Sequence, residues 1–458
     1  MKRILAIFLC FCIFFCFTAC DNAPTESIIE NTPIPTPTTT PHVHSFEPAT
    51  CLNAETCATC GLTQGEKSAH NFVFGECSVC KDYNPTYCPK LYFSGDLTQM
   101  TSKKDVRNIT FEYKSKDQIV SGAAKVKVQG SSSLGYDKKN YTINFYKDSA
   151  YTEKLGLDVG WGKQNSYCLK ANWIDKTHSR NIVSAKLAGQ IQKKYGLLET
   201  APNNGAIDGF PVEVYINGSF HGLYTMNIPK DAWMFNMDKN NPNHIVVCGE
   251  DWFAPVLFRE VPNDLGSWTV EVGPENSETL KKIQRLVSFV LNSSDEEFKE
   301  NFNEYLNLDS TINYYIMINY GWMPDNTGKN MLLATYDGKV WYPSLYDLDT
   351  TWGANYKGTG LYSYKNNNLS LNNSLLWERL EKLFKKEIAN RYFELRQTIL
   401  DPKNVMAEFN AFYNSIPAEI IAREEAKWKN IPGYPLTQIE SYLNATVPKL
   451  DNKYGAWK

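Results

Sequence analysis

The sequence predicts an α+β protein in which a strand-rich half precedes a helical half, with a small cysteine-rich module in front of both. Apolar and polar residues alternate in short runs between residues 106 and 226, which is the period of half-buried strands. Beyond Glu278 apolar residues recur at helical spacing, and six of the twelve cysteines crowd between Cys51 and Cys88. With 458 residues and a hydrophobic content of 43%, the chain is long enough for about three domains and is not disordered throughout.

The N-terminus predicts an export signal. Lys2 and Arg3 precede an apolar run over residues 4–17, which is shorter than the roughly 20 residues of a membrane-spanning helix but typical of a signal peptide. The run ends in Phe17-Thr18-Ala19-Cys20, which resembles the lipobox of bacterial lipoproteins, whose cysteine is diacylated and becomes the new N-terminus. We expect a signal peptide over residues 1–19 and a lipid anchor on Cys20 at the outer face of the bacterial membrane. An ordinary signal peptide with an incidental cysteine is the alternative.

Two short segments separate this signal from the large domain. Residues 20–41 are rich in threonine and proline, and we expect an extended linker there because proline fixes φ and removes backbone donors. Residues 42–88 contain two C-x-x-C motifs, Cys57–Cys60 and Cys77–Cys80, with sixteen residues between them. This spacing predicts a zinc-ribbon-like module in which four thiolates hold one structural zinc ion in place of a core. A disulfide cluster is the alternative, because export permits oxidation.

The strand-rich half begins at about Pro89. We expect strands over 106–113 and 123–129, a serine-rich turn over 130–135, and returning strands over 138–145 and 166–171. Residues 180–195 have apolar positions at helical spacing. The runs 211–216 and 220–226 flank Asn217-Gly218, and this pair predicts a hairpin with a type I′ turn because both residues tolerate positive φ.

The helical half follows Glu278. Asp309 or Ser310 is expected to cap a helix that runs through residues 314–318, residues 339–342 and 344–346 are expected to form a short hairpin, and the last hundred residues read mostly as helix. A strand-rich half beside a helical half places a cleft between two lobes, which is where ligands usually bind.

The densest group of candidate catalytic side chains lies in the second half. Asp325 and Asn330 form a D-x-x-x-x-N motif, and Asp347 and Asp349 follow in the run Tyr346–Gly353. Phosphoryl transfer needs a carboxylate to orient the attacking hydroxyl and oxygen ligands to hold magnesium on the phosphates, and these residues supply both in the order that protein kinases use. A simple turn at Asp325 and a surface calcium site at the two later aspartates are the alternatives.

These motifs, together with residues 129–133, 138–139, 169–175, 180–181 and 222–224, resemble the spore-coat protein H (CotH) family over roughly residues 90–420. The resemblance implies an atypical, kinase-like two-lobe domain over 89–420, followed by a helical extension over 421–458. It also implies transfer of phosphate from ATP, with Mg²⁺ or Mn²⁺, to Ser or Thr of surface or spore coat proteins. Its implied roles are catalysis for Asp325, metal binding for Asn330, Asp347 and Asp349, and nucleotide contact for Lys139, Lys170, Ser131, Ser132 and Ser133.

Four features depart from the expected pattern. Met323-Pro324 replace the His-Arg that precedes the catalytic aspartate of protein kinases, and the metal motif is D-L-D without the glycine of D-F-G. The helix over 180–195 has no glutamate to pair with a lysine, and Asn227 stands where the family often places a glutamate. The near-balanced charge, net −3, argues against nucleic acid as a partner, because a nucleic-acid surface needs a concentrated basic face. We expect a protein substrate and a membrane contact through the lipid anchor alone. A non-catalytic surface or spore coat protein with the same fold is the second hypothesis, and recognition of wall polysaccharide through exposed aromatic side chains is the third.

Overall fold

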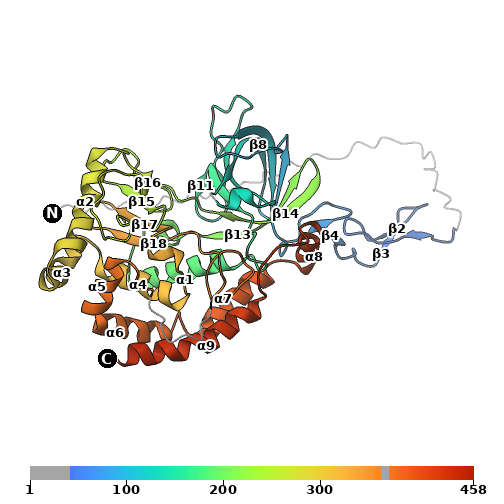
Figure 1. The fold of residues 1–458 in the computed structure, drawn as a ribbon. Coiled ribbons are helices and arrows are strands. Elements are labelled where there is room, and N and C mark those ends of the chain that lie inside the picture. The colour runs from blue at the N-terminus through green and yellow to red at the C-terminus, as the bar shows by residue number, and fades with distance from the viewer. Residues whose placement is uncertain (1–41, 131, 363–370) are drawn as a thin grey trace, which may run out of the picture. The chain divides into compact units, whose positions relative to one another are not determined.

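The structure is a computed structural model that describes residues 42–130, 132–362 and 371–458 (Figure 1). The expected signal peptide, the linker, Cys20 and Ser131 lie outside the described residues. The chain divides after Ala69 into two compact units. In the described residues no helix has both the length and the apolar character needed to cross a membrane.

The described part of the first unit, residues 42–69, is a small antiparallel sheet in the order β1-β2-β3. Its strands are β1 (Phe46–Glu47), β2 (Glu55–Cys57) and β3 (Thr63–Gln64). Within residues 42–69 Cys57 is the one buried residue, and every other side chain is partly or fully exposed. The unit therefore has almost no apolar core of its own.

The second unit begins with a short hairpin, β4 (Phe72–Val73) and β5 (Glu76–Cys77), and continues into a closed barrel of seven strands. Around the barrel the order is β12-β14-β13-β6-β7-β8-β9, with every neighbouring pair antiparallel except β6 and β13. The strands are β6 (Lys90–Ser94), β7 (Val106–Lys114), β8 (Ile119–Gln129), β9 (Asn140–Tyr146), β12 (Ser166–Lys170), β13 (Gly209–Ile216) and β14 (Ser219–Asn227).

The sequence patterns account for these strands. Along β7 alternate residues such as Ile109, Phe111 and Tyr113 are buried while their neighbours are exposed, as the period of two requires. Asn217 and Gly218 have φ values of 49° and 78°, which confirms the type I′ turn between β13 and β14. The alternating pattern predicted the strands, but not that they close into a barrel.

A four-stranded sheet, a two-stranded sheet of β10 (Leu157–Asp158) and β11 (Lys163–Gln164), and the helices form most of the rest of the second unit (Figure 1). The four-stranded sheet has the order β16-β15-β17-β18, with β15 (Ile245–Gly249), β16 (Trp268–Val272), β17 (Met331–Thr335) and β18 (Tyr342–Leu345). The helices are α1 (Arg180–Lys194), α2 (Ser277–Asn292), α3 (Asp295–Asn301), α4 (Leu308–Tyr320), α5 (Leu375–Leu383), α6 (Lys385–Arg396), α7 (Pro402–Asn414), α8 (Ala418–Lys427) and α9 (Leu436–Gly455). The chain is thus of mixed α and β structure, as expected.

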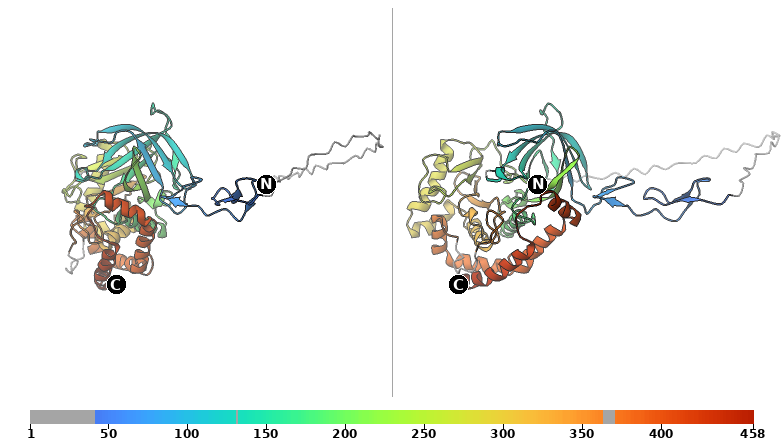
Figure 2. Two further views of the ribbon diagram at one scale, coloured as in Figure 1. Left: turned by 90° about the vertical axis from the view of Figure 1, so that its right-hand side faces the viewer. Right: turned by 45° about the vertical axis from the view of Figure 1, so that its right-hand side comes forward.

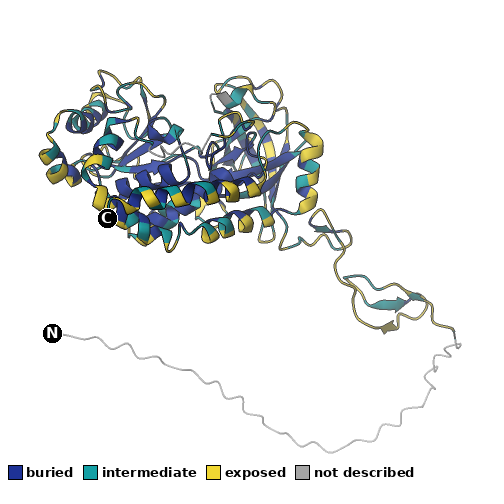
Figure 3. Ribbon diagram, turned by 60° about the horizontal axis from the view of Figure 1, so that its bottom comes forward, coloured by how far each residue is buried: buried dark blue, intermediate teal, exposed yellow. Residues whose placement is uncertain are grey.

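The barrel strands and the long helices α7 and α9 lie on opposite sides of the second unit in the views of Figures 1 and 2. Figure 3 shows that these helices are buried along one face and exposed along the other. The buried face includes Phe409 of α7 and Tyr442 of α9, whose rings both contact the fully buried Trp352. The Trp352 side chain therefore joins the C-terminal helices to the segment that follows β18.

Two expectations for the helical half are wrong. The short hairpin of residues 339–342 and 344–346 does not form; β18 pairs instead with β17, because Asp337 accepts hydrogen bonds from the backbone of Lys339 and Val340 and closes a longer turn. The N-cap of α4 is Asn307, whose side chain accepts a hydrogen bond from Ser310 N at 2.8 Å, so the helix begins before the predicted caps.

A buried ion pair fastens α8 to the barrel. The Lys138 ammonium lies 2.6 Å from Glu424 Oε1, and the two side chains are 0% and 2% exposed. Lys138 also donates to the carbonyls of Ala171 and Leu223, while Glu424 Oε2 accepts from Leu223 N at 2.7 Å. Because both charges are removed from water, each depends on the other for its place in the core.

Candidate active site

A cleft of about 1190 Å³ lies in the second unit, with walls from the barrel strands β8, β9 and β12, from β16, and from the segments next to β17 and β18. The predicted site residues that line it are Ser133, Lys170, Asp325, Asn330, Asp347 and Asp349. Lys139 is not among the described residues that line the cleft. The structure therefore brings most of the described candidates together, although they are spread over more than two hundred positions of the chain.

The β17–β18 pair explains how Asn330 and Asp347 come together. Asn330 immediately precedes β17, Asp347 follows β18 by one residue, and the register pairs Met331 with Leu345. Because the strands are antiparallel, the start of one lies beside the end of the other. Asn330 and Asp347 both have positive φ, 60° and 59°, in the left-handed region that Asn and Asp tolerate better than most residues.

Asp325 sits in the short helical turn η4 (Asp325–Thr327), which a hydrogen-bond network holds in place. Its neighbour Asn326 is buried, accepts a hydrogen bond from the Tyr314 hydroxyl at 2.6 Å, and donates from its side chain to the Tyr346 carbonyl at 2.8 Å. Burial raises the pKa of Asp325, against the opposing charge of Lys329. A carboxylate with a raised pKa, carried on a fixed turn, suits a group that accepts a proton.

Lys170 and Asp347 form an ion pair across the cleft, with 3.2 Å between the ammonium and Oδ1. The Lys170 side chain is 9% exposed and the Asp347 side chain 37% exposed, so the carboxylate is the accessible partner. Burial alone would raise the pKa of Asp347, but the charge and hydrogen bond of Lys170 outweigh it and lower that pKa. Asp347 thus keeps a negative charge where it faces the cleft.

Asp349 also lines this end of the cleft, and no lysine of the described residues forms an ion pair with it. Burial, followed by the negative charge of Asp347, raises the pKa of Asp349 well above its usual range. Asp347, Asp349 and the Asn330 amide therefore supply oxygen atoms to the same cleft, and the two aspartates repel each other when both are ionised. A divalent cation satisfies such a donor set, because Mg²⁺ prefers carboxylate and amide oxygens.

Two side chains of the cleft, Lys230 and Glu271, escaped the sequence analysis. Lys230 lies 2.6 Å from Glu271 Oε1 and 4.9 Å from the centre of the Tyr346 ring, and it lines the cleft with both of them. No motif joins Lys230 to Glu271, because they come from a loop and from β16. The one sequence signal was that Glu271 is the single charged residue of β16.

The serine-rich turn is described in part. Ser131 and the side chain of Ser132 lie outside what the structure describes. Gly130 has a φ of +111°, and a Cβ there would lie 1.8 Å from Ser133 Oγ, so this position requires glycine. Lys139 donates to the Leu134 carbonyl at 2.7 Å and to the Tyr136 carbonyl, and thereby holds the turn closed rather than facing the cleft.

The cysteine motifs have histidine neighbours. In the first unit Cys57 and Cys60 lie with His42 and His44, and in the second unit Cys77 and Cys80 lie with His70. This grouping differs from the single set of four cysteines expected from the spacing, because a histidine precedes each motif and takes a place beside its thiols. Hydrogen bonds, that of His44 first, lower the pKa of Cys57 to about 5.

A family model described as CotH kinase protein matches residues 126–452. The match begins within β8 and ends within α9, so it includes Lys170 and the whole acidic end of the cleft. A comparison with curated proteins finds no match.

Proposed function

Because the chain belongs to the CotH kinase protein family, we propose that it is an ATP-dependent protein kinase that phosphorylates Ser or Thr of surface or spore coat proteins. The observation that carries this proposal is the arrangement of Asp325, Asn330 and Asp347 at one end of a cleft that Lys170 and Lys230 also line. In this reading the barrel and the helical part with its sheet are the two lobes of a kinase-like domain. The cleft exceeds the roughly 300–1,000 Å³ of a typical small-molecule site, which leaves room for a nucleotide and a substrate hydroxyl.

The donor set fits a nucleotide with a divalent cation. Asn330, Asp347 and Asp349 supply the oxygen ligands, and Mg²⁺ or Mn²⁺ bound there neutralises charge on the transferred phosphoryl group. Lys170 keeps Asp347 ionised and oriented. The Lys230–Glu271 pair lies in the cleft, and we assign it the positioning role that a glutamate on α1 would otherwise have.

Asp325 is the proposed catalytic residue. Its carboxylate orients the hydroxyl of the substrate Ser or Thr and accepts its proton as that oxygen bonds to the γ-phosphorus of ATP. The bond from the γ-phosphorus to the bridging oxygen breaks, and ADP leaves. Gly130 and the turn that follows it cover the phosphates, and Lys139 keeps that turn closed. The proposed nucleotide contact of Ser131 and Ser132 rests on the sequence resemblance.

The test is transfer of labelled γ-phosphate from ATP by the purified protein, to itself and to a Ser-rich basic peptide. Asp325→Asn is expected to lower the rate by about 10²–10⁴-fold, because proton transfer by a positioned group contributes that much. The matched control is Asp117→Asn, which changes an exposed aspartate on the turn between β7 and β8 and leaves the rate unchanged. Nucleotide-dependent thermal stabilisation is measured beside it and is expected to persist in Asp325→Asn.

Three outcomes separate the hypotheses. Equal label with the parent and with Asp325→Asn rejects Asp325 as the catalytic group. No label from either, with nucleotide stabilisation retained, favours a non-catalytic coat or surface protein that keeps the fold. Stabilisation by wall saccharide and not by nucleotide favours the polysaccharide-binding alternative.

We also propose that Cys20 carries the lipid that anchors the protein outside the cell membrane. The support is the lipobox-like sequence before it, and the family suggests an association with the spore coat. Cys20→Ser is expected to abolish incorporation of labelled palmitate and to release the protein from the membrane fraction. Retention of label in that variant would show that the anchor lies elsewhere.

A further inference from the structure

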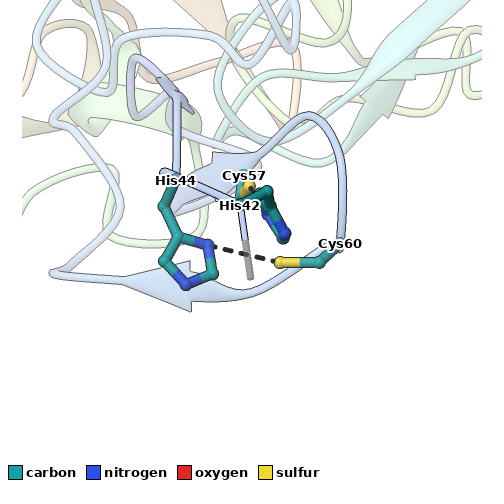
Figure 4. Close-up of side chains that lie close together, drawn as sticks. All are labelled: His42, His44, Cys57 and Cys60. Atoms are coloured by element: carbon teal, nitrogen blue, oxygen red, sulfur yellow. Dashed lines mark hydrogen bonds between the residues drawn. The ribbon is translucent and has the colours of Figure 1, made fainter. Parts of the chain in front are cut away.

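The first unit contains a compact group of histidine and cysteine side chains that the phosphotransfer site does not use. Its members, called here the His/Cys cluster, are His42, His44, Cys57 and Cys60 (Figure 4). One nitrogen or sulfur atom of each lies within 4.8 Å of the corresponding atom of every other. We propose that the His/Cys cluster binds one zinc ion in a closed structural site, independently of the cleft in the second unit.

The backbone of the first unit builds the two halves of this site. β1 pairs with β2 so that Phe46 lies opposite Cys57, and this places the residues just before β1 beside the C-x-x-C motif. His42 and His44 are two positions apart, and the centroids of their rings lie 4.7 Å from each other, so both side chains lie on the same side of the chain. Figure 4 shows the two imidazoles beside the two thiols.

The turn after β2 has the form that a metal-binding C-x-x-C motif needs. Gly61 N donates to the Cys57 carbonyl at 2.9 Å, and Cys57 N donates to the Leu62 carbonyl at 2.7 Å. Gly61 has a φ of +73°, which lets the chain turn directly after the second cysteine. The two thiols are thus held on one side of a tight turn before any metal arrives.

The distances agree with a tetrahedral ion. His42 Nε2 lies 3.4 Å from Cys57 Sγ, and His44 Nδ1 lies 3.4 Å from Cys60 Sγ. Ligand atoms at zinc bond lengths of about 2.0–2.3 Å in tetrahedral geometry are about 3.5 Å apart. The two nitrogen–sulfur pairs are therefore already at the separation that one shared zinc ion requires.

The described residues of the first unit form almost no apolar core. Cys57 is the single buried residue of 42–69, and the strands are two or three residues long. So small a unit cannot bury enough apolar surface to offset its chain entropy, and metal binding is one of the few ways to fold it. Four protein ligands fill every tetrahedral position, so the site is structural and leaves no place for a substrate.

The second unit repeats the local design, which supports the inference. His70 Nδ1 lies 3.2 Å from Cys80 Sγ, and Lys81 N donates to the Cys77 carbonyl at 3.1 Å, as Gly61 N does to Cys57. Each C-x-x-C motif therefore has a histidine of its own unit beside it. This assignment replaces the expected site of four cysteines with mixed histidine and cysteine ligands.

The test uses the full chain loaded with Zn²⁺ and then with Co²⁺, whose absorption spectrum reports the number of thiolate ligands. Replacing both histidines, His42→Asn with His44→Asn, is expected to remove one equivalent of zinc per chain. The control His244→Asn alters a histidine of the second unit and keeps the full zinc content. Because the double variant can lose zinc simply by unfolding, His44→Cys is measured as well, and it is expected to keep its zinc while the thiolate charge-transfer absorption of cobalt increases.

Two results would overturn the assignment. If the double histidine variant keeps all its zinc while Cys57→Ser loses it, the ligands are cysteines alone. If the protein binds no zinc and Cys57 and Cys60 resist thiol reagents until they are reduced, the cluster is a disulfide site. Neither readout depends on phosphate transfer, so both are valid whether or not the protein is an active kinase.

Discussion

The buried pair of Lys138 and Glu424 offers the sharpest test of how the barrel and the C-terminal helices hold together. In Lys138→Met the Glu424 carboxylate stays 2% exposed and loses the ammonium 2.6 Å away. Removing one partner of a buried pair leaves an uncompensated charge and costs about 3–5 kcal/mol. Glu424 still accepts a hydrogen bond from Leu223 N in this variant, so we expect the loss of stability to stay within that range.

Urea denaturation of the full chain, followed by tryptophan fluorescence and by circular dichroism, measures this cost. Trp428 at the end of α8 donates to the His221 carbonyl at 2.9 Å and reports on the same contact. The double variant Lys138→Met with Glu424→Gln is expected to be more stable than Lys138→Met alone, because no charge remains buried and glutamine still accepts from Leu223 N. The control Lys147→Met breaks a pair whose side chains are 56% and 63% exposed and should cost less than about 1 kcal/mol.

The reasoning fails if Lys138→Met costs as little as the exposed control. It also fails if the loss in the double variant equals the sum of the two single losses, since that sum would mean that the two charges do not interact.

Two further predictions concern single side chains. Burial lowers the pKa of His178 to about 4, below the roughly 6.5 of an unfolded chain, so its contribution to stability is complete above pH 6.5 and is lost as the pH falls towards 4. We expect the urea midpoint to fall between pH 7 and pH 4.5, and His178→Asn, which suits the φ of 55° there, to make that fall shallower; an unchanged slope would contradict a neutral buried imidazole. Asn307→Ala removes the cap of α4 and should lower the free energy of unfolding by about 1 kcal/mol, whereas Asn307→Ser should restore most of it; equal losses in both variants would show that the cap hydrogen bond does not stabilise the helix.

Local signals in the sequence predicted local structure well. Asn217-Gly218 predicted its turn because only the two residues themselves decide whether positive φ is tolerated. β17 was missed because Met331–Thr335 is fully buried and shows no alternation, and its partner was then sought in the wrong place. The closure of the barrel depends on pairings between distant strands, and no short window of sequence contains them.

The acidic end of the cleft was predictable for a different reason. Asp325, Asn330 and Asp347 are close in sequence and occur in the order in which protein kinases place their catalytic and metal-binding residues. The antiparallel pair β17–β18 brings them together. Lys230 and Glu271 belong to no recognisable motif, because they meet only after the fold has brought the loop that contains Lys230 beside β16. For the cysteine motifs the signal was present and was under-used: His42, His44 and His70 all precede a C-x-x-C motif at short range.

The parallel pairing of β6 with β13 has a consequence for how the chain folds. Lys90 of β6 pairs with Glu213 of β13, more than a hundred positions later. One edge of β6 therefore stays unpaired until β13 has been synthesised. Contacts between residues so far apart in the sequence make folding slow, because the chain between them loses conformational entropy before the contact stabilises the fold. A chain that leaves the ribosome or a translocation pore N-terminus first therefore exposes an unpaired edge at β6 until half of it has emerged. During that interval the free edge of β6 is open to pairing with other chains.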